Sequence, residues 1–523
     1  MDMEKFTPLE GLMKLLDSTS RKPIVHKIPK SYKKQYQEVF KKLDIDEDYQ
    51  EDFFINYDGV VASCESFFKR HPKYHVVRDF MDDVLVLWHK FDKRDENLII
   101  YRPEVVLMVV LFAKANGCTD FEQYADFWLR NNLYFQYLLP GMPEPKHMIT
   151  SETIRTICTI VKDEDMDDLF KAYFGEVRNF MKEVTHDYKD LPPCIFDEVT
   201  GDKVDFLSTF GFDGQEIRAS SQEGKVSRKC KRHGVSLYAC ECNTVLAAMC
   251  VNKKNQELSS FFKMYSSIMG VFEDHLVISD SLNARKDFFD FFDFCDFYGI
   301  DYCMPIKAAY GLKPLFNKFN EFFTEENLNT LESHEILTQS HNSLEHGRYE
   351  TVTYTLVSIK HFDKDLLPSQ RIKCVLRRVK TSQRVVKTAT KEEQAKLKPT
   401  TEVHYYVLSL DFCNATLLQA IHSIGVHWNY EAHHNILDTV LLQDMQAVST
   451  DNTASFIIKS NKMVFNLLTY VRARTTRTTP KGAVKVPSYK QVMAKMSNPL
   501  TAFKYFIDYF LDRPETESEQ EQA

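Results

Sequence analysis

The sequence of 523 residues has no apolar run long enough to cross a membrane. The longest, from Val105 to Ala113, is far shorter than the roughly 18 to 20 residues that a spanning helix needs. The opening residues MDMEKFTPLE are charged and acidic, unlike the basic start and apolar centre of a secretory signal. We therefore expect a soluble, intracellular protein with no membrane partner.

The sequence also lacks the cysteine pattern of a disulfide-stabilised fold. Its 12 cysteines are scattered along a long chain, which indicates buried thiols. A zinc site made of Cys230, His233, Cys240 and Cys242 is a weak alternative. Their spacing fits no common zinc motif, and Cys240 and Cys242 are predicted to lie within a strand.

An overall positive charge, common in nucleic-acid-binding domains, is missing as well. The formal net charge is -8, yet basic residues gather in three segments, 225–232, 371–398 and 471–490. A charge run is usually a solvated face. Three such runs in one chain nevertheless favour phosphate contacts by some of them.

The chain is too long for one hydrophobic core, and it contains no internal repeat. Residues 1–75 read as a helical extension without chemistry. Residues 76–190 continue with helical apolar periodicity and predict an all-helical domain. The periodicity changes at Leu191-Pro192-Pro193, where the second half of the chain begins.

From there the pattern predicts strand, hairpin, helix, strand, helix and strand, which is the element order of an RNase H-like α/β core. The predicted elements are a strand over 205–212, a hairpin over 235–251, helices over 257–269 and 282–298, and strands over 275–279 and 302–306. Residues 191–310 form the first part of this core, 311–401 a mostly β insertion, 402–470 the second part, and 471–523 a basic segment, a helix and an acidic tail. We therefore expect an RNase H-like core with a β-rich insertion, preceded by an all-helical domain.

Three acids stand out as candidate metal ligands. Asp213 and Asp280 each directly follow a strand-like apolar run, and Glu431 lies within a predicted helix over 421–444. Helical spacing puts His427, Asn435 and Asp438 on the same face as Glu431, and such a face is polar for a core. Two strand-end aspartates and a helical glutamate would form a carboxylate triad.

Alternatives to these assignments remain open. Asp197 and Glu198 compete with Asp213 as the first ligand, and Asp438 and Asp444 are the next candidates if Glu431 points away from both aspartates. Trp428, on the same predicted helix, is more often a core residue than a base-stacking one.

Several motifs in this order resemble the DDE transposases of bacterial insertion sequences, in the branch that contains the H-repeat-associated proteins. The resemblance runs from about Phe91 to Leu468. The motifs are GMPEPKHMITSETIRTI, FDGQEIRAS, VNKKNQEL, VISDSLNAR, YCMPIKAAYGLK, HGRYET and VHWNYEAHHNILD. The first resembles a motif of the family's N-terminal associated helical domain, and the others follow the order and spacing of its catalytic part.

The resemblance implies a transposase that cleaves and joins DNA strands, with Asp213, Asp280 and Glu431 as catalytic metal ligands. Two Mg²⁺ or Mn²⁺ ions, roughly 3.5 to 4 Å apart, would serve such an in-line displacement. The implied phosphate-holding residues are Lys254, Lys307 and Arg348, and the supporting histidines are His346, His427 and His434. The basic segment 471–490 adds Arg472, Arg474 and Arg477 as expected DNA-binding residues. The implied partners are the element's ends and target DNA, bound by a homodimer or higher oligomer. The expected location is the cytoplasm and nucleoid of a bacterial host, or the nucleus of a eukaryotic one.

The sequence departs from the family pattern at a few positions. Gln215 replaces a lysine, Ala309-Tyr310 an Asn-Gln pair and Gly425 an arginine, and one residue is missing between Glu431 and His434. Retention of all three acids favours activity, whereas these replacements count against it. A catalytically silent DNA-binding descendant and a metal-dependent nuclease without joining activity are the two alternative functions.

Overall fold

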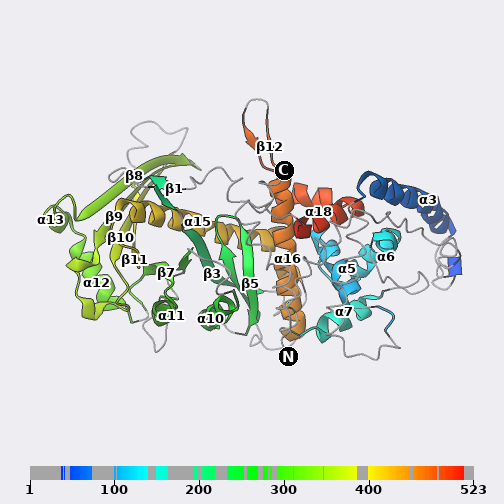
Figure 1. Ribbon diagram of the computed structural model, residues 1–523, viewed down its shortest axis with the longest axis horizontal. Coiled ribbons are helices and arrows are strands. Elements are labelled where there is room, and N and C mark those ends of the chain that lie inside the picture. The colour runs from blue at the N-terminus through cyan, green and yellow to red at the C-terminus, as the bar shows by residue number, and fades with distance from the viewer. Residues whose placement is uncertain are drawn as a thin grey trace, which may run out of the picture.

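The computed structural model describes most of the chain from residue 47 onward. The described residues are 34, 37, 38, 41, 47–72, 99–101, 103–138, 149–162, 166, 194–196, 203–205, 207–217, 232–252, 256–268, 275–280, 283–284, 291–309, 311–345, 347–385, 398–446, 451–479 and 482–511. They form a part built on a sheet and a helical part. The long helix α16 (Asp451–Thr475) stands between the two (Figure 1).

The helical part is built around α5, whose residues are apolar on every side. Its helices are α3 (Glu47–Arg70), α5 (Pro103–Ala115), α6 (Phe121–Leu138) and α7 (Ser151–Ile160). Side chains from Val105 to Ala113 are all buried, so α5 forms the centre on which α6 and α7 pack. The Asp120 carboxylate accepts the N–H of Gln123 at 2.8 Å and caps the start of α6.

The other part contains a nine-stranded sheet with the order β5-β4-β3-β6-β7-β11-β10-β9-β8. The strands are β3 (Ser208–Ile217), β4 (Arg232–Ala239), β5 (Thr244–Val251), β6 (His275–Ser279), β7 (Asp301–Ile306), β8 (Ile336–Glu345), β9 (Arg348–Ser358), β10 (Cys374–Arg384) and β11 (Thr400–Leu408). β5, β4 and β3 form an antiparallel meander, whereas β6 is parallel to β3 and β7 is parallel to β6. The molecule is thus mixed α/β, with one large mixed sheet.

Helices α10 (Glu257–Ile268) and α11 (Phe291–Tyr298) connect these first five strands and carry an aromatic cluster. The ring of Phe212 in β3 stacks on Phe261 of α10, with 4.1 Å between ring centroids. Phe291 packs against both rings, at 6.0 Å from Phe212 and 5.8 Å from Phe261. One face of β3 is therefore buried under aromatic side chains.

The residues between β7 and β11 extend the same sheet and do not form a separate one. Helices α12 (Lys313–Phe322) and α13 (Glu325–Leu328) lead into β8, and the 3₁₀ turns η4 (Ile359–His361) and η5 (Lys364–Leu366) separate β9 from β10. β11 pairs antiparallel with both β10 and β7, so the chain returns beside the strand from which it left. The alternating residues Val352, Tyr354 and Leu356 of β9 are buried, as the sequence pattern predicted.

Helix α15 (Asn414–Thr439) crosses the face of the sheet opposite to the aromatic cluster. Its first half carries Leu417, Ala420 and Ile424, which belong to one buried cluster with Ile278 of β6 and Leu356 of β9. Its second half is much more polar and lies over β3. Beyond it come η6 (Gln443–Met445) and then α16.

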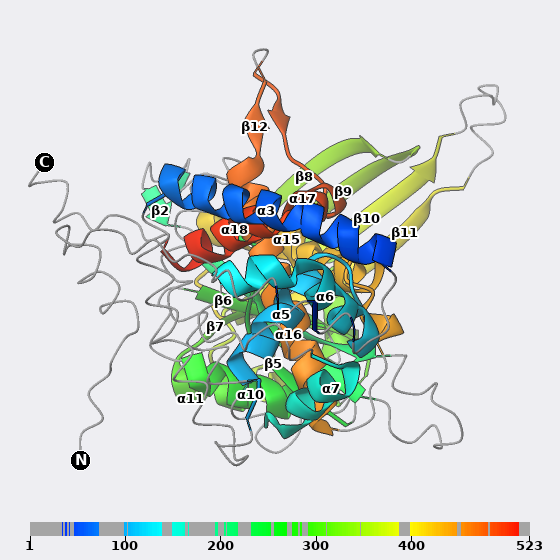
Figure 2. The same cartoon turned by 90° about the vertical axis from the view of Figure 1, so that its right-hand side faces the viewer.

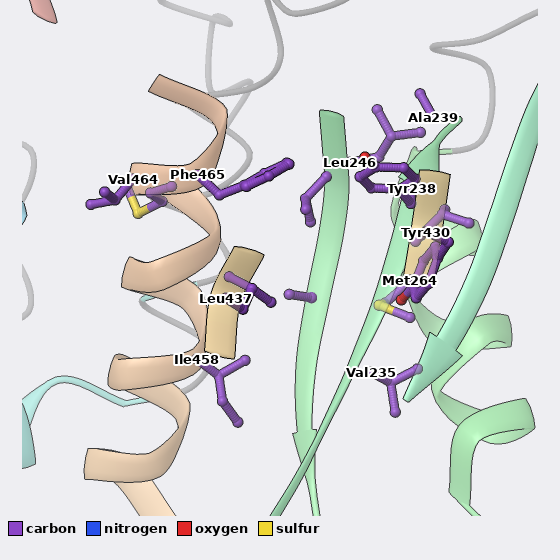
Figure 3. Close-up of a cluster of buried hydrophobic side chains, with 14 of the residues drawn as sticks. Val235, Tyr238, Ala239, Leu246, Met264, Tyr430, Leu437, Ile458, Val464 and Phe465 are labelled. Carbon is purple, nitrogen blue, oxygen red and sulfur yellow. The ribbon is translucent and has the colours of Figure 1, made fainter. Parts of the chain in front are cut away.

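Helix α16 closes the outer edge of the sheet at β5. The side-chain amide of Asn466 donates to the carbonyl oxygen of Val245 and accepts its N–H, both at 2.9 Å. The amide therefore makes the two backbone hydrogen bonds with Val245 that a neighbouring strand would otherwise make. Figure 3 shows Ile458, Val464 and Phe465 of α16 beside Leu437 of α15 and the strands β4 and β5.

The C-terminal segment returns to the helical part. After α16 come a small hairpin, β12 (Arg477–Thr478) and β13 (Val484–Lys485), and the helices α17 (Tyr489–Met496) and α18 (Pro499–Leu511). A second small pair, β1 (Cys194–Phe196) and β2 (Lys203–Asp205), precedes β3. None of the helices in the described part of the chain is long and apolar enough to cross a membrane.

Two predicted boundaries in the sheet-containing part are wrong. The strand expected to end at Phe212 continues through Asp213 to Ile217, because its backbone keeps pairing with β4. The helix expected from Leu282 is absent at Asn283 and Ala284. There the Asn283 N–H donates to the carbonyl of Asp280, which makes a turn instead.

Candidate functional site

Asp213 and Asp280 follow the last paired residues of two neighbouring parallel strands. β3 and β6 run in register from Ser208↔His275 to Phe212↔Ser279, and the two aspartates are the next residue on each strand. The Ser279 hydroxyl donates to the carbonyl of Phe212 at 2.8 Å, and the side chain of Asn283 donates to that hydroxyl at 2.8 Å. These bonds fix the end of β6 against β3, directly beside the two acids.

The pleat of β3 turns Asp213 away from the aromatic cluster and toward α15. Phe212 faces α10, so its neighbours Gly211 and Asp213 lie on the other face. A Cβ on Gly211 would be 3.4 Å from the ring of Tyr430 and 3.6 Å from Nδ1 of His427. The absence of a side chain at Gly211 therefore lets the polar half of α15 approach the strand closely.

Tyr430 ties α15 to the two central strands. Its hydroxyl lies 2.8 Å from the carbonyl oxygen of Asp213 and 3.0 Å from that of Ser236. The side chain is buried, and both acceptors are backbone atoms of paired strands. This contact fixes the distance between α15 and the strand that bears Asp213.

Glu431 is the next residue on α15 and lies close enough to Asp280 to be affected by its charge. The pKa of Glu431 is raised, first by partial burial and then by the negative charge of Asp280. Asp280 also has Lys307 at 3.9 Å, and both side chains are about half exposed. Asp280 and Glu431 thus form an acidic pair open to solvent, with one lysine at its side.

Asp438, two turns further along α15, has a different environment. Its carboxylate accepts the side-chain amide of Gln215 at 2.7 Å, and its charge acts on the buried Lys462 of α16. Burial lowers the pKa of Lys462 to about 7, while the charges of Asp438 and Asp213 oppose that shift. Asp438 therefore belongs to an interior polar cluster, whereas Glu431 belongs to the open acidic pair.

Two histidines of α15, His427 and His434, are held neutral. Burial lowers the pKa of His427 to about 4, although the negative charge of Asp280 acts in the opposite direction. Burial and the positive charge of Lys462 lower the pKa of His434 to about 3. Among the described residues, His427 Nδ1 and His434 Nε2 are buried without a hydrogen-bond partner.

The donor chemistry of the acidic pair suits a hard divalent cation. Carboxylate oxygens are the protein ligands that Mg²⁺ prefers, and the mutual repulsion of Asp280 and Glu431 would be relieved by such a charge. As the side chains stand, no three ligating groups in the described parts of the chain lie close enough together to hold a metal ion. The acids would have to rotate toward one another to share one.

The remaining predicted residues are dispersed. Lys254 and His346, and the alternative ligands Asp197 and Glu198, lie outside the described residues. Arg348 is exposed at the start of β9, and Arg474 and Arg477 are exposed where α16 ends. Arg472, in contrast, is used structurally: its Nε donates to the carbonyl of Pro487 at 3.0 Å. Asp444 lies in η6, beyond the end of α15.

Two minor predictions can be compared with the structure. Trp428 was expected to be a core residue, but its surface is 58% exposed, one helical turn before Glu431. The zinc alternative fails because His233 and Cys240 lie at opposite ends of β4, about 20 Å apart at the usual rise of a strand. Cys240 and Cys242 lie in the turn after β4 and not within a strand, and His233 contacts Glu257 at 2.7 Å.

Sequence reasoning missed Tyr430, Lys462 and Asn283. Tyr430 lies within the polar stretch that attracted attention, but nothing marked it as the residue that holds α15 to β3. Lys462 sits in an otherwise ordinary helix, and its burial depends on the packing of α16 against β5 and α15. No local pattern could have identified it.

Comparison with solved structures gives distant similarity. No family model matches the chain, and no curated protein matches it. Among solved structures, it is similar to a piggyBac transposase in a synaptic complex with hairpin DNA, at 10% sequence identity and a TM-score of 0.32. The match covers 85% of this chain and 80% of that chain. A similarity this weak leaves the functional argument to the residues themselves.

Proposed function

We propose that the protein is a DDE-type transposase with an RNase H-like core, which cleaves DNA strands and joins them to a target. The observation that carries this proposal is that Asp213 and Asp280 occupy corresponding positions, each directly after the last paired residue of two in-register parallel strands. Both lie near the helix that bears Glu431. The order β5-β4-β3-β6-β7, with three antiparallel strands followed by two parallel ones, supports the core assignment. The membership of a bacterial insertion-sequence branch stays part of this proposal.

In this proposal Asp213, Asp280 and Glu431 hold two divalent metal ions. Bound Mg²⁺ or Mn²⁺ would supply activation of the attacking oxygen and charge stabilisation at the leaving oxygen. Lys307, half exposed beside Asp280, would hold a DNA phosphate near the acids. The neutral His427 packs beside Asp280 and adds no positive charge to compete with the metal ions.

The DNA partner and an oligomeric assembly follow from the same proposal. Joining an element's two ends to a target needs two active sites that act together, so a homodimer or higher oligomer is proposed. The element ends and the target strand would both approach the exposed side of the Asp280–Glu431 pair. Localisation with the host's DNA, in a nucleoid or a nucleus, completes the proposal.

A catalytically silent DNA-binding descendant is the second candidate. The observation in its favour is Lys307, which already offers Asp280 a positive charge at 3.9 Å. In addition, no three ligating groups among the described residues stand close enough together to hold a metal ion. Such a protein would bind DNA without cutting it. The experiment below separates the two.

The test is strand cleavage and joining of supercoiled and linear duplex DNA by the full chain in Mg²⁺, Mn²⁺ or EDTA. We expect nicking and joining that require a divalent ion and are lost in Asp280→Asn and Glu431→Gln, whereas Asp438→Asn retains them. Tight binding without nicking in either metal would favour the silent descendant. Nicking without joining would favour a plain nuclease.

A further inference from the structure

The hairpin β12–β13 is a slender projection from the body of the molecule. It leaves the end of α16 and returns at the start of α17, and it extends beyond the neighbouring helices in both views (Figure 1, Figure 2). The strands pair as Arg477↔Lys485 and Thr478↔Val484. Next to these pairs, the Thr479 N–H donates to the carbonyl oxygen of Ala483 at 2.8 Å. Gly482 has a positive φ of 78°, which favours glycine.

The base of this hairpin is held firmly. Arg472 donates to the carbonyl of Pro487 at 3.0 Å, and its guanidinium lies 5.0 Å from the ring centre of Tyr489. Ser488 and Gln491 form a capping box at the start of α17. Fixed ends make the hairpin an oriented arm, because both of its strands start from anchored residues.

The arm has two different faces. Residues directly opposite each other in an antiparallel pair lie on the same face, so Arg477 and Lys485 share one and Thr478 and Val484 share the other. All four are exposed, and the surface of Val484 is 65% exposed. An exposed valine beside two exposed cations is a composition suited to a partner that offers both negative charge and apolar groups.

The charge around the arm is of one sign over a long stretch. Residues 452–507 contain ten lysines and arginines, of which Lys459 and Lys462 are buried in α16, and no aspartate or glutamate, although the whole chain has a formal net charge of -8. Concentrated positive charge on an acidic protein favours a polyanion as the occupant of this surface.

We propose that the β12–β13 hairpin enters the major groove of duplex DNA, with Arg477 and Lys485 on phosphates. Two strands about 4.8 Å apart, with their side chains, make a ribbon roughly 10 Å wide. The major groove is about 12 Å wide and admits such a ribbon, whereas the minor groove is only about 6 Å wide. Thymine methyl groups on the groove floor give Val484 an apolar partner. The choice of DNA as ligand rests on the proposed function, but the binding needs no catalysis.

The test measures binding of a fluorescent 30-base-pair duplex by the full chain in EDTA at several salt concentrations. Arg477→Ala/Lys485→Ala should lower the slope of log K against log salt by about two units, since each phosphate contact contributes about one. The matched control Lys490→Ala/Lys495→Ala removes the same charge from α17 and should change the slope by less than about half a unit. Thermal unfolding of each variant checks that its fold is retained.

Binding to duplexes methylated before the measurement tests which groove the hairpin enters. Methylation of guanine N7, which faces the major groove, should weaken binding by the wild-type protein and not by the double variant. Methylation of adenine N3 in the minor groove should have no effect, and a double-stranded RNA should be bound equally by both proteins, because its major groove is too narrow for side chains to read.

The outcomes separate this inference from the proposed function. An unchanged salt slope in the double variant, or interference only from adenine N3, overturns the hairpin assignment and leaves strand cleavage standing. A loss of slope in a protein that never nicks DNA supports the hairpin and contradicts the transposase. A wild-type protein that does not bind duplex DNA contradicts both.

Discussion

The two faces of strand β3 carry side chains of opposite character. On one face Phe212 stacks against Phe261 and Phe291, without a charged group between them. On the other face Asp213 lies under Tyr430, in a region of neutral histidines and unpaired polar atoms. Because successive side chains of a strand alternate, adjacent residues place an aromatic ring on one face and a carboxylate on the other. The comparison predicts that substitutions on the two faces have opposite effects on folding and activity.

The largest effect on folding is expected from the aromatic face. Phe261→Ala should lower the free energy of unfolding by about 3–5 kcal/mol, because it leaves a cavity where a fully buried ring touches several others. Urea denaturation followed by circular dichroism measures it. Phe297→Ala, in which the lost ring is 74% exposed on α11, should change stability by no more than about 0.5 kcal/mol. Equal losses in both variants would contradict the division between the faces.

On the other face, Asp280→Asn should leave folding intact and remove activity. Its side chain is half exposed, so we expect a change in stability within about 0.5 kcal/mol. Strand cleavage in Mg²⁺ should fall on the order of a hundredfold or more, because charge that stabilises the transition state is lost. The control Asp293→Asn, on the exposed side of α11, should cut DNA normally. Retained cleavage in Asp280→Asn would remove this residue from the proposed site.

Tyr430→Phe tests the contact that joins α15 to β3 and β4. Loss of its hydroxyl leaves the carbonyl groups of Asp213 and Ser236 with one donor fewer in a buried position, which should cost about 1–3 kcal/mol. Chemical denaturation measures the cost, with the partly exposed Tyr298→Phe as control. A variant as stable as the wild type would show that other contacts hold α15 in place.

The fourth effect concerns pH and is measured as a slope of stability against pH. Burial lowers the pKa of His427 to about 4, so between about pH 6.5 and pH 4 the unfolded chain binds a proton that the folded chain does not. The free energy of unfolding should therefore fall as pH falls through this range, by up to about 1.4 kcal/mol per pH unit for one proton, and should not depend on this group above it. His434 acts in the same direction.

Denaturation at several pH values for wild type and His427→Gln measures this linkage. The variant should lose up to the part of the slope that corresponds to one proton. An identical slope in wild type and His427→Gln would show that this histidine is not protonated on unfolding.

The fold was predictable where a local pattern determines it. The sequence correctly predicted the hairpin of β4 and β5, the strand β6, the helix α18 and the alternation of β9, because each has a clear period or a turn at its end. Sheet order was beyond such patterns. That β11 returns beside β7, or that Asn466 closes the edge of β5, depends on contacts between residues far apart in the chain.

The candidate site divides in the same way. Asp280 was located because it directly follows an apolar strand, but β3 continues past Asp213, since Gly214 and Gln215 still pair with β4. The different environments of Glu431 and Asp438 could not be predicted, because both acids share one helical face. Only their partners in the structure, Asp280 for Glu431 and Gln215 for Asp438, distinguish them. Whether these acids bind metal ions stays a prediction.

The closed edge at β5 has a consequence for self-association. Backbone groups at a free edge invite another strand, and a sheet with two free edges can grow without limit. Here Asn466 and α16 cover one edge, whereas β8 at the other has no outer strand among the described residues. Two copies that joined through β8 would leave no edge for a third, so strand pairing in this protein would end at a dimer and could not propagate into a fibre.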